Sequence, residues 1–176
     1  MAWVSDGGAA RLLAHISAEA KAADWLGLLA PFESGSERTI SLHLAVLTEP
    51  YLGFLLAGQK TVESRFSVRA TTPFGRVARD DVVLVKAPGG PIVGAFTAAA
   101  VWHYRLDPRS WHDVRNEFSL ALCAQDGFWD LRASASFATL MTVADVRRLP
   151  PVKIPKKDRR GWVVLLDRYH PSSLFE

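Results

Sequence analysis

The apolar residues of this chain come in short runs, and Gly or Pro separates most of these runs. Those with the length and composition of strands are 39–47, 61–67, 81–86, 92–104, 137–149 and 161–167. The Gly and Pro residues between them predict tight turns. Many short strands with few helices predict an α+β fold, in which about five to six strands form a small β-barrel with helices packed outside.

Residues 8–30 carry Leu, Ile and Ala at an approximately helical spacing, and Pro31 ends this pattern. A polar connector follows it. We therefore expect residues 1–37 to form an N-terminal helical extension that packs on a main domain of residues 38–176.

Further helices are expected at two places. A short helix follows Thr48, a residue suited to the N-cap, with Pro50 in its first turn and Gly58 at its end. Residues 108–132 also have a helical character, with a break near Gly127. The two prolines at 150 and 151 are expected to interrupt the strand that starts at residue 137.

Composition excludes several classes of protein. No apolar run reaches the roughly 18 residues that a membrane span needs, so no membrane partner is expected. Cys123 is the only cysteine, which excludes an internal disulfide and a four-cysteine zinc site. Residues 1–6 lack the basic-then-apolar order of a secretory signal, and we expect a cytoplasmic location. No cofactor is expected, and the oligomeric state is left open.

Positive charge is concentrated in two segments of a chain whose formal net charge is only +3. Residues 60–86 carry six basic and three acidic residues, and residues 147–160 carry seven basic residues and one acidic residue. This concentration hints at a phosphate-bearing partner. Two solvated surface segments would have the same composition.

The segment after Gly58 alternates between polar and apolar residues. In a strand, alternate side chains point to opposite faces, so Thr61, Glu63 and Arg65 share one face and the apolar residues share the other. Lys60 lies at the start of this strand. A lysine, a glutamate and an arginine are therefore expected to converge on a small area, although a polar surface hairpin would show the same pattern.

The motif Gly58-x-Lys60-Thr61-x-Glu63-x-Arg65 resembles the signature of ASCH domains, and the helix before it matches that family too. Further blocks resemble a stand-alone prokaryotic branch of the family, in the expected order within residues 39–167. They are Asp81-Val82-Val83-Leu84, Gly89-Gly90-Pro91-Ile92-Val93-Gly94, Phe128-Trp129, Phe137-Ala138-Thr139-Leu140 and Lys156-Lys157-Asp158-Arg159-Arg160-Gly161-Trp162.

The resemblance implies a PUA-like β-barrel with flanking helices and a cleft between the barrel and the helix before the motif. Members of the family are thought to bind RNA. A few are enzymes, either small amidohydrolases that act on acetylated cytidine or proposed ribonucleases. In the amidohydrolases a Thr three residues after the motif Lys is the nucleophile, and Glu63 occupies that position here. This difference favours binding over amide hydrolysis, because a carboxylate between two cations is a good acceptor and a weak general base.

Other segments add candidate contacts. Lys157, Asp158, Arg159 and Arg160 precede the last strand, where Arg suits bidentate phosphate contacts and Lys supplies a point charge; a solvated charge run is the alternative. Further candidates lie among the aromatic residues and the histidines. Phe128 and Trp129 either stack on a base or pack in the core, and His43 either reaches the cleft near Glu63 or is a structural histidine.

Several residues are not expected to carry chemistry. His103 and His112, with Asp107 or Asp113, match no spacing typical of a metal site. Cys123 is interpreted as a small core residue, and Trp162 is expected in the core rather than as a stacking platform. Ser64 and Ser67 have no His or Asp at a spacing that predicts a triad.

Three hypotheses follow from these observations. In the first, the chain binds RNA, another single-stranded nucleic acid or a nucleotide-like ligand in a basic polar cleft. In the second, the chain hydrolyses RNA or a modified nucleoside in the same cleft, with Lys60 and Glu63 as an acid–base pair. In the third, the N-terminal helix recruits a protein partner.

Overall fold

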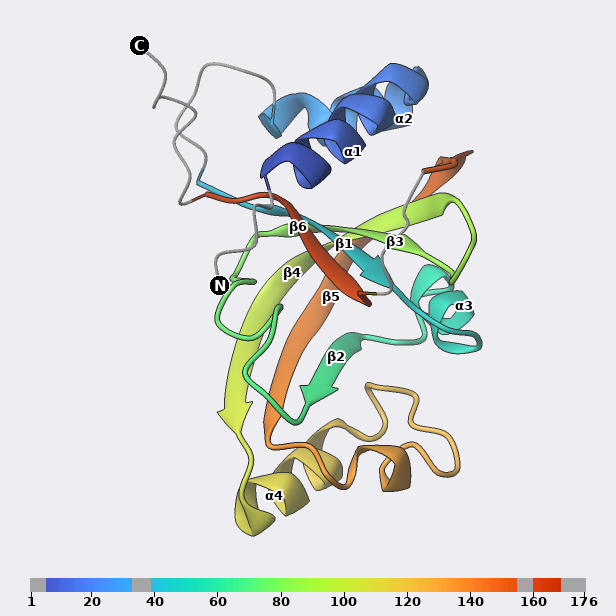
Figure 1. Cartoon of the computed structure of the whole chain (residues 1–176). Helices are drawn as coiled ribbons and strands as arrows, with labels where there is room; N and C mark the ends of the chain where they lie inside the picture. Colours follow the sequence, from blue (N-terminus) through green and yellow to red (C-terminus); the bar gives the residue numbers. More distant parts are fainter. Residues whose placement is uncertain (1–5, 33–38, 155–159, 169–176) are drawn as a thin grey trace.

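The computed structural model describes residues 6–32, 39–154 and 160–168, and within them six strands form one curled sheet (Figure 1). The order of the strands across the sheet is β2-β5-β4-β3-β1-β6. Their bounds are β1 (Leu42–Val46), β2 (Val62–Ser67), β3 (Val82–Lys86), β4 (Ile92–Arg105), β5 (Phe137–Val152) and β6 (Trp162–Leu166). With helices packed on this half-barrel, the predicted α+β fold is confirmed.

The curl of the sheet comes from its two long strands. β4 and β5 pair antiparallel, and their register shifts at three places along the ladder. Such bulges bend a strand and increase its twist. Only β1 and β3 pair in parallel, and the outer strands of the described sheet are β2 and β6. The curl therefore brings the two edges of the sheet toward each other.

Two helices cover one end of the sheet, α1 (Asp6–Glu19) and α2 (Ala23–Leu29), and a 3-10 turn, η1 (Ala30–Phe32), follows them. The expected single helix over residues 8–30 is thus broken after Glu19. The break lets Trp25 turn onto the sheet, where its indole Nε1 donates a hydrogen bond of 2.8 Å to the carbonyl of Pro150.

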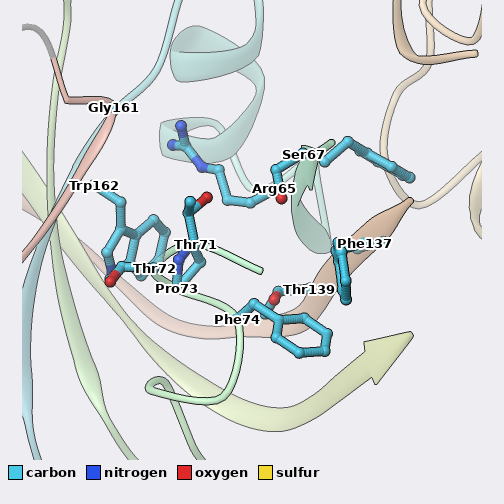
Figure 2. Close-up of a pocket in the computed structure, with 12 residues that line it drawn as sticks. Arg65, Ser67, Thr71, Thr72, Pro73, Phe74, Phe137, Thr139, Gly161 and Trp162 are labelled. Atoms are coloured by element: carbon cyan, nitrogen blue, oxygen red, sulfur yellow. The ribbon is translucent and has the colours of Figure 1, made fainter. Parts of the chain in front are cut away.

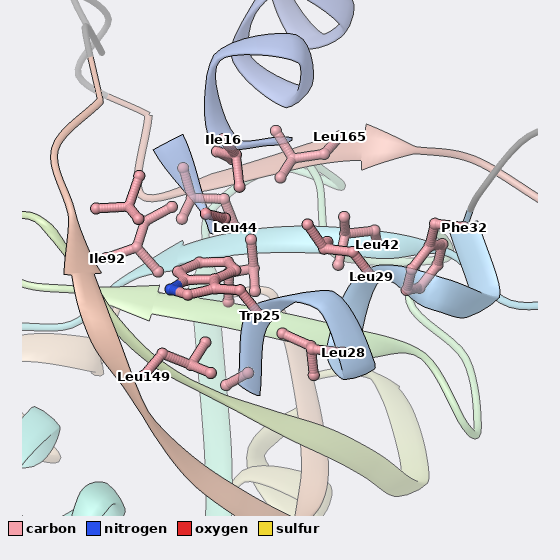
Figure 3. Packing of buried hydrophobic residues seen from close by; sticks show 14 of the residues in the cluster. Ile16, Trp25, Leu28, Leu29, Phe32, Leu42, Leu44, Ile92, Leu149 and Leu165 are labelled. Atoms are coloured by element: carbon pink, nitrogen blue, oxygen red, sulfur yellow. The ribbon is translucent and has the colours of Figure 1, made fainter. Parts of the chain in front are cut away.

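These helices share one apolar core with the sheet (Figure 3). Trp25 and Ile16 are fully buried against Leu42 and Leu44 of β1 and Ile92 of β4. This burial stabilises the N-terminal helices on the sheet. The predicted boundary between residues 37 and 38 falls within residues 33–38, which are outside the described residues.

The helix before the polar strand is α3 (Tyr51–Leu56), and Gly58 ends it with φ of 75°, as expected for a C-terminal glycine. Pro50, rather than Thr48, occupies its N-cap position. The helix lies close to β4, because a Cβ at Gly94 would come within 2.6 Å of the Leu56 side chain. Only glycine at position 94 permits this approach.

The predicted helix over residues 108–132 is wrong in its second half. α4 (Pro108–Phe118) ends early, turns follow, and a 3-10 turn, η2 (Asp130–Arg132), comes last. Cys123 has φ of 53°, so it lies in a turn and not in a helix. The chain folds back here because Phe128 and Trp129 pack with Phe118 of α4 in one buried cluster.

Two predictions about strands are also wrong. β5 continues through Pro150 and Pro151. β2 pairs only with residues 137–142, so the second half of β5 makes no ladder hydrogen bonds to β2. Proline, which has no N–H to donate, is tolerated at such an unpaired edge. β1 has no solvent-facing side, because its first four residues are buried: Leu42 and Leu44 pack in the cluster with the N-terminal helices, and Ala45 packs in a second apolar cluster on the other face.

Candidate functional site

Lys60, Glu63 and Arg65 converge at β2, as the alternation predicted. Lys60 Nζ lies 3.3 Å from Glu63 Oε2, and Arg65 Nε lies 3.1 Å from Glu63 Oε1. The side chains of Lys60 and Glu63 are only 3% and 5% exposed, and Lys60 Nζ also donates to the carbonyl of Val62 at 2.5 Å. These two residues therefore form a buried ion pair behind Arg65, and not the open polar face that the sequence suggested.

Arg65 joins the two edges of the curled sheet. From β2 it donates a hydrogen bond of 3.0 Å through a terminal nitrogen to the carbonyl of Val46 in β1. Its guanidinium lies 5.2 Å from the ring of Trp162 in β6, and a Cβ at Gly161 would come within 3.2 Å of it. The absence of a side chain at Gly161 is therefore part of what admits the guanidinium.

The Arg65 guanidinium keeps hydrogen-bonding capacity for a ligand. Its Nε contacts Glu63 as an ion pair, but the N–H is not aligned with the carboxylate, and Nε lacks an aligned hydrogen bond in the described structure. The guanidinium has five N–H groups. One of them, on a terminal nitrogen, bonds in good geometry to a described protein atom, the carbonyl oxygen of Val46. The side chain is 22% exposed, so a small ligand has access to it.

A buried polar chain holds Trp162 in place. Its indole Nε1 donates to Nδ1 of His43 at 3.1 Å, and Nε2 of His43 lies 3.0 Å from Asp81 Oδ2. Asp81 also accepts hydrogen bonds from the backbone N–H of Ser41 and from the side chain of Arg168. Because Nδ1 accepts from the indole, the proton of the neutral imidazole is on Nε2 and points to the carboxylate.

A pocket of about 190 Å³ opens between Arg65 and a loop of residues 71–74 (Figure 2). We call it the Arg65 pocket. It combines one guanidinium, several aromatic rings and several hydroxyl groups. Its lining consists of Arg65, Phe66, Ser67, Thr71, Thr72, Pro73, Phe74, Phe137, Ala138, Thr139, Gly161 and Trp162. Such a mixture suits a flat, polar-edged ligand that stacks on rings and accepts hydrogen bonds at its rim.

A row of polar side chains runs from this pocket across three strands; Arg65 and Thr139 line the pocket, and His103 does not. Arg65 of β2 lies opposite Thr139 of β5, and Thr139 lies opposite His103 of β4. Thr139 Oγ1 is 3.1 Å from Nδ1 of His103, whose Nε2 is 3.1 Å from the carbonyl of Val77. The sequence interpretation placed Thr139 in a family motif but did not connect it with His103.

Arg132 is a further residue that the sequence interpretation missed. Its guanidinium lies 3.7 Å from the ring of Phe128, and it donates to the Phe128 carbonyl at 2.7 Å. Burial lowers the pKa of Arg132, whereas the negative charge of Glu63 acts in the opposite direction. Arg132 therefore contributes positive charge on the side of Glu63 that faces the aromatic cluster. Only its position near the Phe128–Trp129 motif could have indicated this.

The other candidate residues lie at different places. His43 is fully buried and contacts Trp162 and Asp81, so it is a structural histidine and reaches the Arg65 pocket only through Trp162. Phe128 and Trp129 are buried in the aromatic cluster with Phe66 and Trp111, not placed as stacking platforms.

Two of the other candidates are exposed. Thr61 is exposed just before β2, and Arg160 is exposed next to Gly161. Lys157, Asp158 and Arg159 lie outside the described residues. Trp162 is buried, as expected, and it also lines the pocket.

The described residues contain no group of three or more His, Cys, Asp or Glu side chains that could hold a metal ion. No helix among them is long and apolar enough to cross a membrane.

The fold is similar to that of solved ASCH structures. The crystal structure of ASCH from Zymomonas mobilis superposes with a TM-score of 0.52 over 64% of this chain and 73% of that chain, at 14% sequence identity. The chain has an ASCH-type fold. Two structures of single-substitution mutants of the Zymomonas mobilis ASCH protein superpose with the same TM-score at 16% identity, covering 64% of this chain and 76% and 74% of theirs.

No family model and no curated protein matches the sequence. At this level of identity the similarity establishes the ASCH-type fold and not an activity.

Proposed function

We propose that this protein binds RNA, or another single-stranded nucleic acid, by accepting one nucleotide in the Arg65 pocket. The observation that carries the proposal is the position of Arg65. It is held by Val46 and Glu63 where the two edges of the curled sheet meet, and it lines the pocket together with Trp162, whose ring lies 5.2 Å away.

Arg65 supplies the charge that a nucleotide requires. A guanidinium forms bidentate hydrogen bonds to phosphate and to base edges, and a partly buried guanidinium is screened less by solvent than a surface lysine. The buried carboxylate of Glu63 holds this guanidinium in one orientation. Pre-organisation of this kind lowers the entropy that binding must overcome.

The walls of the pocket supply the remaining chemistry. Phe74 and Phe137 contact each other edge to face, with ring centroids 5.0 Å apart, so their rings are held in fixed positions beside the cavity. Base stacking on an aromatic ring contributes about 1–3 kcal/mol per base. The hydroxyl groups of Thr71 and Thr72 lie at the rim, where they are exposed. Rings and hydroxyls together recognise a base with polar edges.

The size of the pocket favours one nucleotide unit over a longer segment. Its volume of about 190 Å³ is below the roughly 300–1,000 Å³ of ordinary ligand sites. The rest of a bound strand would then run over the surface. Arg160 is exposed beside the pocket residue Gly161, in the segment that the sequence identifies as basic. This position suits a contact with a neighbouring phosphate.

The geometry favours a supporting role for Lys60 and Glu63 over acid–base catalysis. Both side chains are buried, they bond to each other and to Val62, and neither lines the Arg65 pocket. A general base has to reach the proton that it removes. We therefore infer that Lys60 and Glu63 position Arg65 and do not contact the ligand.

The test is the affinity of the protein for short single-stranded RNA, single-stranded DNA and duplex RNA at 50 and 200 mM salt. We expect binding to single strands that weakens with salt. R65A should weaken binding about tenfold or more, and so should R65K, because Lys keeps the charge but not the bidentate geometry of the guanidinium. R79A is the matched control: Arg79 is exposed, pairs with Asp80 and is absent from the pocket lining, and R79A removes one positive charge. No binding at 50 mM salt, or equal losses in R65A and R79A, would overturn the proposal.

A further inference from the structure

Thr139, which lines the Arg65 pocket, contacts the imidazole of His103, which lies outside the lining, in the row Arg65–Thr139–His103 across β2, β5 and β4. Directly opposed residues in an antiparallel pair point to the same face, with Cβ atoms about 4.5–5.5 Å apart. We propose that Thr139 is a nucleophile, that His103 is its general base, and that the pair transfers the acyl group of a small ester to water. This proposal uses the same pocket but does not rest on nucleic-acid binding.

The hydrogen bonds of His103 determine which ring nitrogen is the base. Nε2 lies 3.1 Å from the carbonyl oxygen of Val77, which only accepts, so Nε2 carries the proton. The backbone N–H of Gly75 donates to Nδ1 at 3.3 Å, which requires a lone pair there. Two independent contacts therefore assign the same tautomer. The Thr139 hydroxyl, 3.1 Å from Nδ1, donates to the same lone pair and shares it with the Gly75 N–H, so Gly75 has to move off Nδ1 when the proton is transferred.

This arrangement has the three parts of an activated hydroxyl: a nucleophile, a base within hydrogen-bond reach, and a group that orients the base. The Val77 carbonyl occupies the place where a carboxylate often lies. A neutral carbonyl stabilises an imidazolium less than a carboxylate does, so we expect slow turnover. The ring of Phe74 packs edge-on against His103, with centroids 5.4 Å apart, and holds the imidazole in this orientation.

Thr139 is placed for attack from within the fold. The residue is only 1% exposed and lines the pocket, so it borders the cavity and is largely shielded from bulk water. Arg65, its neighbour across the ladder, also lines the cavity, with its guanidinium between the Val46 carbonyl and the Trp162 ring. A guanidinium there stabilises negative charge that develops on a bound carbonyl oxygen.

The proposed reaction balances with water as the only second substrate. Thr139 Oγ1 forms a bond to the ester carbon while its proton moves to Nδ1 of His103, and the oxyanion faces Arg65. Collapse breaks the bond to the leaving alcohol, which takes the proton from Nδ1. Water then gives a proton to Nδ1 and attacks the acyl-threonine, and the carboxylic acid is released as the proton returns to Thr139 Oγ1.

Acyl transfer fits the charge of the site better than phosphoryl transfer does. A tetrahedral acyl intermediate carries one negative charge, which one guanidinium can oppose. In phosphoryl transfer the charge spreads over three equatorial oxygens and is usually met by several cationic groups. Arg65 is the one cationic residue that lines the described pocket.

The test uses two probes on the full chain. p-Nitrophenyl acetate reports turnover, and a fluorophosphonate, whose tetrahedral phosphorus mimics the acyl-transfer transition state, reports the nucleophile by peptide mass spectrometry. We expect one label per chain on Thr139, with T139S retaining it. H103N should lower the labelling rate by about 100-fold or more, the size of a general-base contribution. T142V is the matched control, since Thr142 pairs with Val62 and lies outside the pocket.

The result that overturns the proposal is equally specific. Absence of a label on the wild-type chain, a label on Ser67 in place of Thr139, or an unchanged rate in H103N would each exclude the pair. If T139V does not fold, H103N carries the decision, because His103 is exposed and its replacement leaves the core intact. If the wild-type protein does not bind RNA but Thr139 is still labelled, the proposed function is rejected and this inference stands.

Discussion

The indole Nε1 of Trp162 donates a hydrogen bond of 3.1 Å to Nδ1 of His43, 119 positions earlier in the chain. This bond joins a wall of the Arg65 pocket to the buried carboxylate of Asp81, which holds the other ring nitrogen. The ring near Arg65 is thus oriented by two buried residues that do not line the pocket. Four predictions test this arrangement and its neighbours.

Replacement of His43 by Leu should lower the free energy of unfolding by about 1–3 kcal/mol, the cost of one unsatisfied buried group. The variant leaves the Trp162 N–H buried without its partner, whereas Asp81 Oδ2 keeps the hydrogen bond from the backbone N–H of Ala78. Urea denaturation measures the change, and H112L at an exposed position should stay within about 0.5 kcal/mol of the wild type. A fully stable H43L protein would show that the polar chain does not support the fold.

E63Q should destabilise the protein more than K60M does. Removing the charge of Glu63 leaves Lys60 and Arg65 facing each other without a counter-charge, and loss of one partner of a buried pair costs about 3–5 kcal/mol. K60M leaves the contact between Glu63 and Arg65 in place. A double-mutant cycle with K60M/E63Q measures the coupling, and losses that simply add would contradict a direct pair.

G161A should weaken RNA binding several-fold while leaving the protein folded. The added Cβ would lie 3.2 Å from the Arg65 guanidinium, so the guanidinium must shift by a few tenths of an ångström from its position. The control is G27A, because a Cβ there meets no atom within 4 Å. G27A lies within helix α2 and should stabilise the fold by about 0.5–1 kcal/mol. Equal RNA affinities in the two variants would show that Arg65 does not depend on the gap at Gly161.

D107N should remove part of the acid sensitivity of the fold. Hydrogen bonds from the backbone and side chain of Ser110 hold the pKa of Asp107 below its ordinary value of 3.8. A lowered pKa in the folded state gives stability that is present above the ordinary value and is lost as the pH falls through the folded value. Asn keeps an N-cap acceptor but does not titrate.

The measurement for D107N is the unfolding midpoint between pH 2 and pH 6. We expect the difference between the wild type and D107N to shrink as the pH falls in that range. A difference that stays constant with pH would show that the charge of Asp107 does not contribute. The exposed Asp126 provides the matched variant, D126N.

Some features of the site follow from local sequence alone. The alternation after Gly58 places Glu63 and Arg65 on one face of a strand, and the contacts of 3.3 and 3.1 Å confirm that Lys60, Glu63 and Arg65 meet. Gly58 stops α3 because it has φ of 75°, which most residues avoid. These features depend on neighbours within a few positions, so a single segment determines them.

The burial of these residues was not predictable in the same way. The polar pattern of β2 suggested a solvent-facing surface, yet Lys60 and Glu63 are buried. His43 likewise lies in a strand with buried residues on both faces. Whether a polar face meets water depends on which elements cover it, and the covering elements come from distant parts of the chain.

The sequence by itself determined the strands, the turns between most of them and the charged cluster of β2, because each depends on short-range backbone preference. Only the tertiary structure decided the rest. The bulges of the β4–β5 ladder accompany the curl of the sheet, Arg65 meets Trp162 where its edges approach, and Thr139 lies beside His103. These pairs arise from sheet curvature and strand register, which are set by the packing of the whole core and not by any one segment.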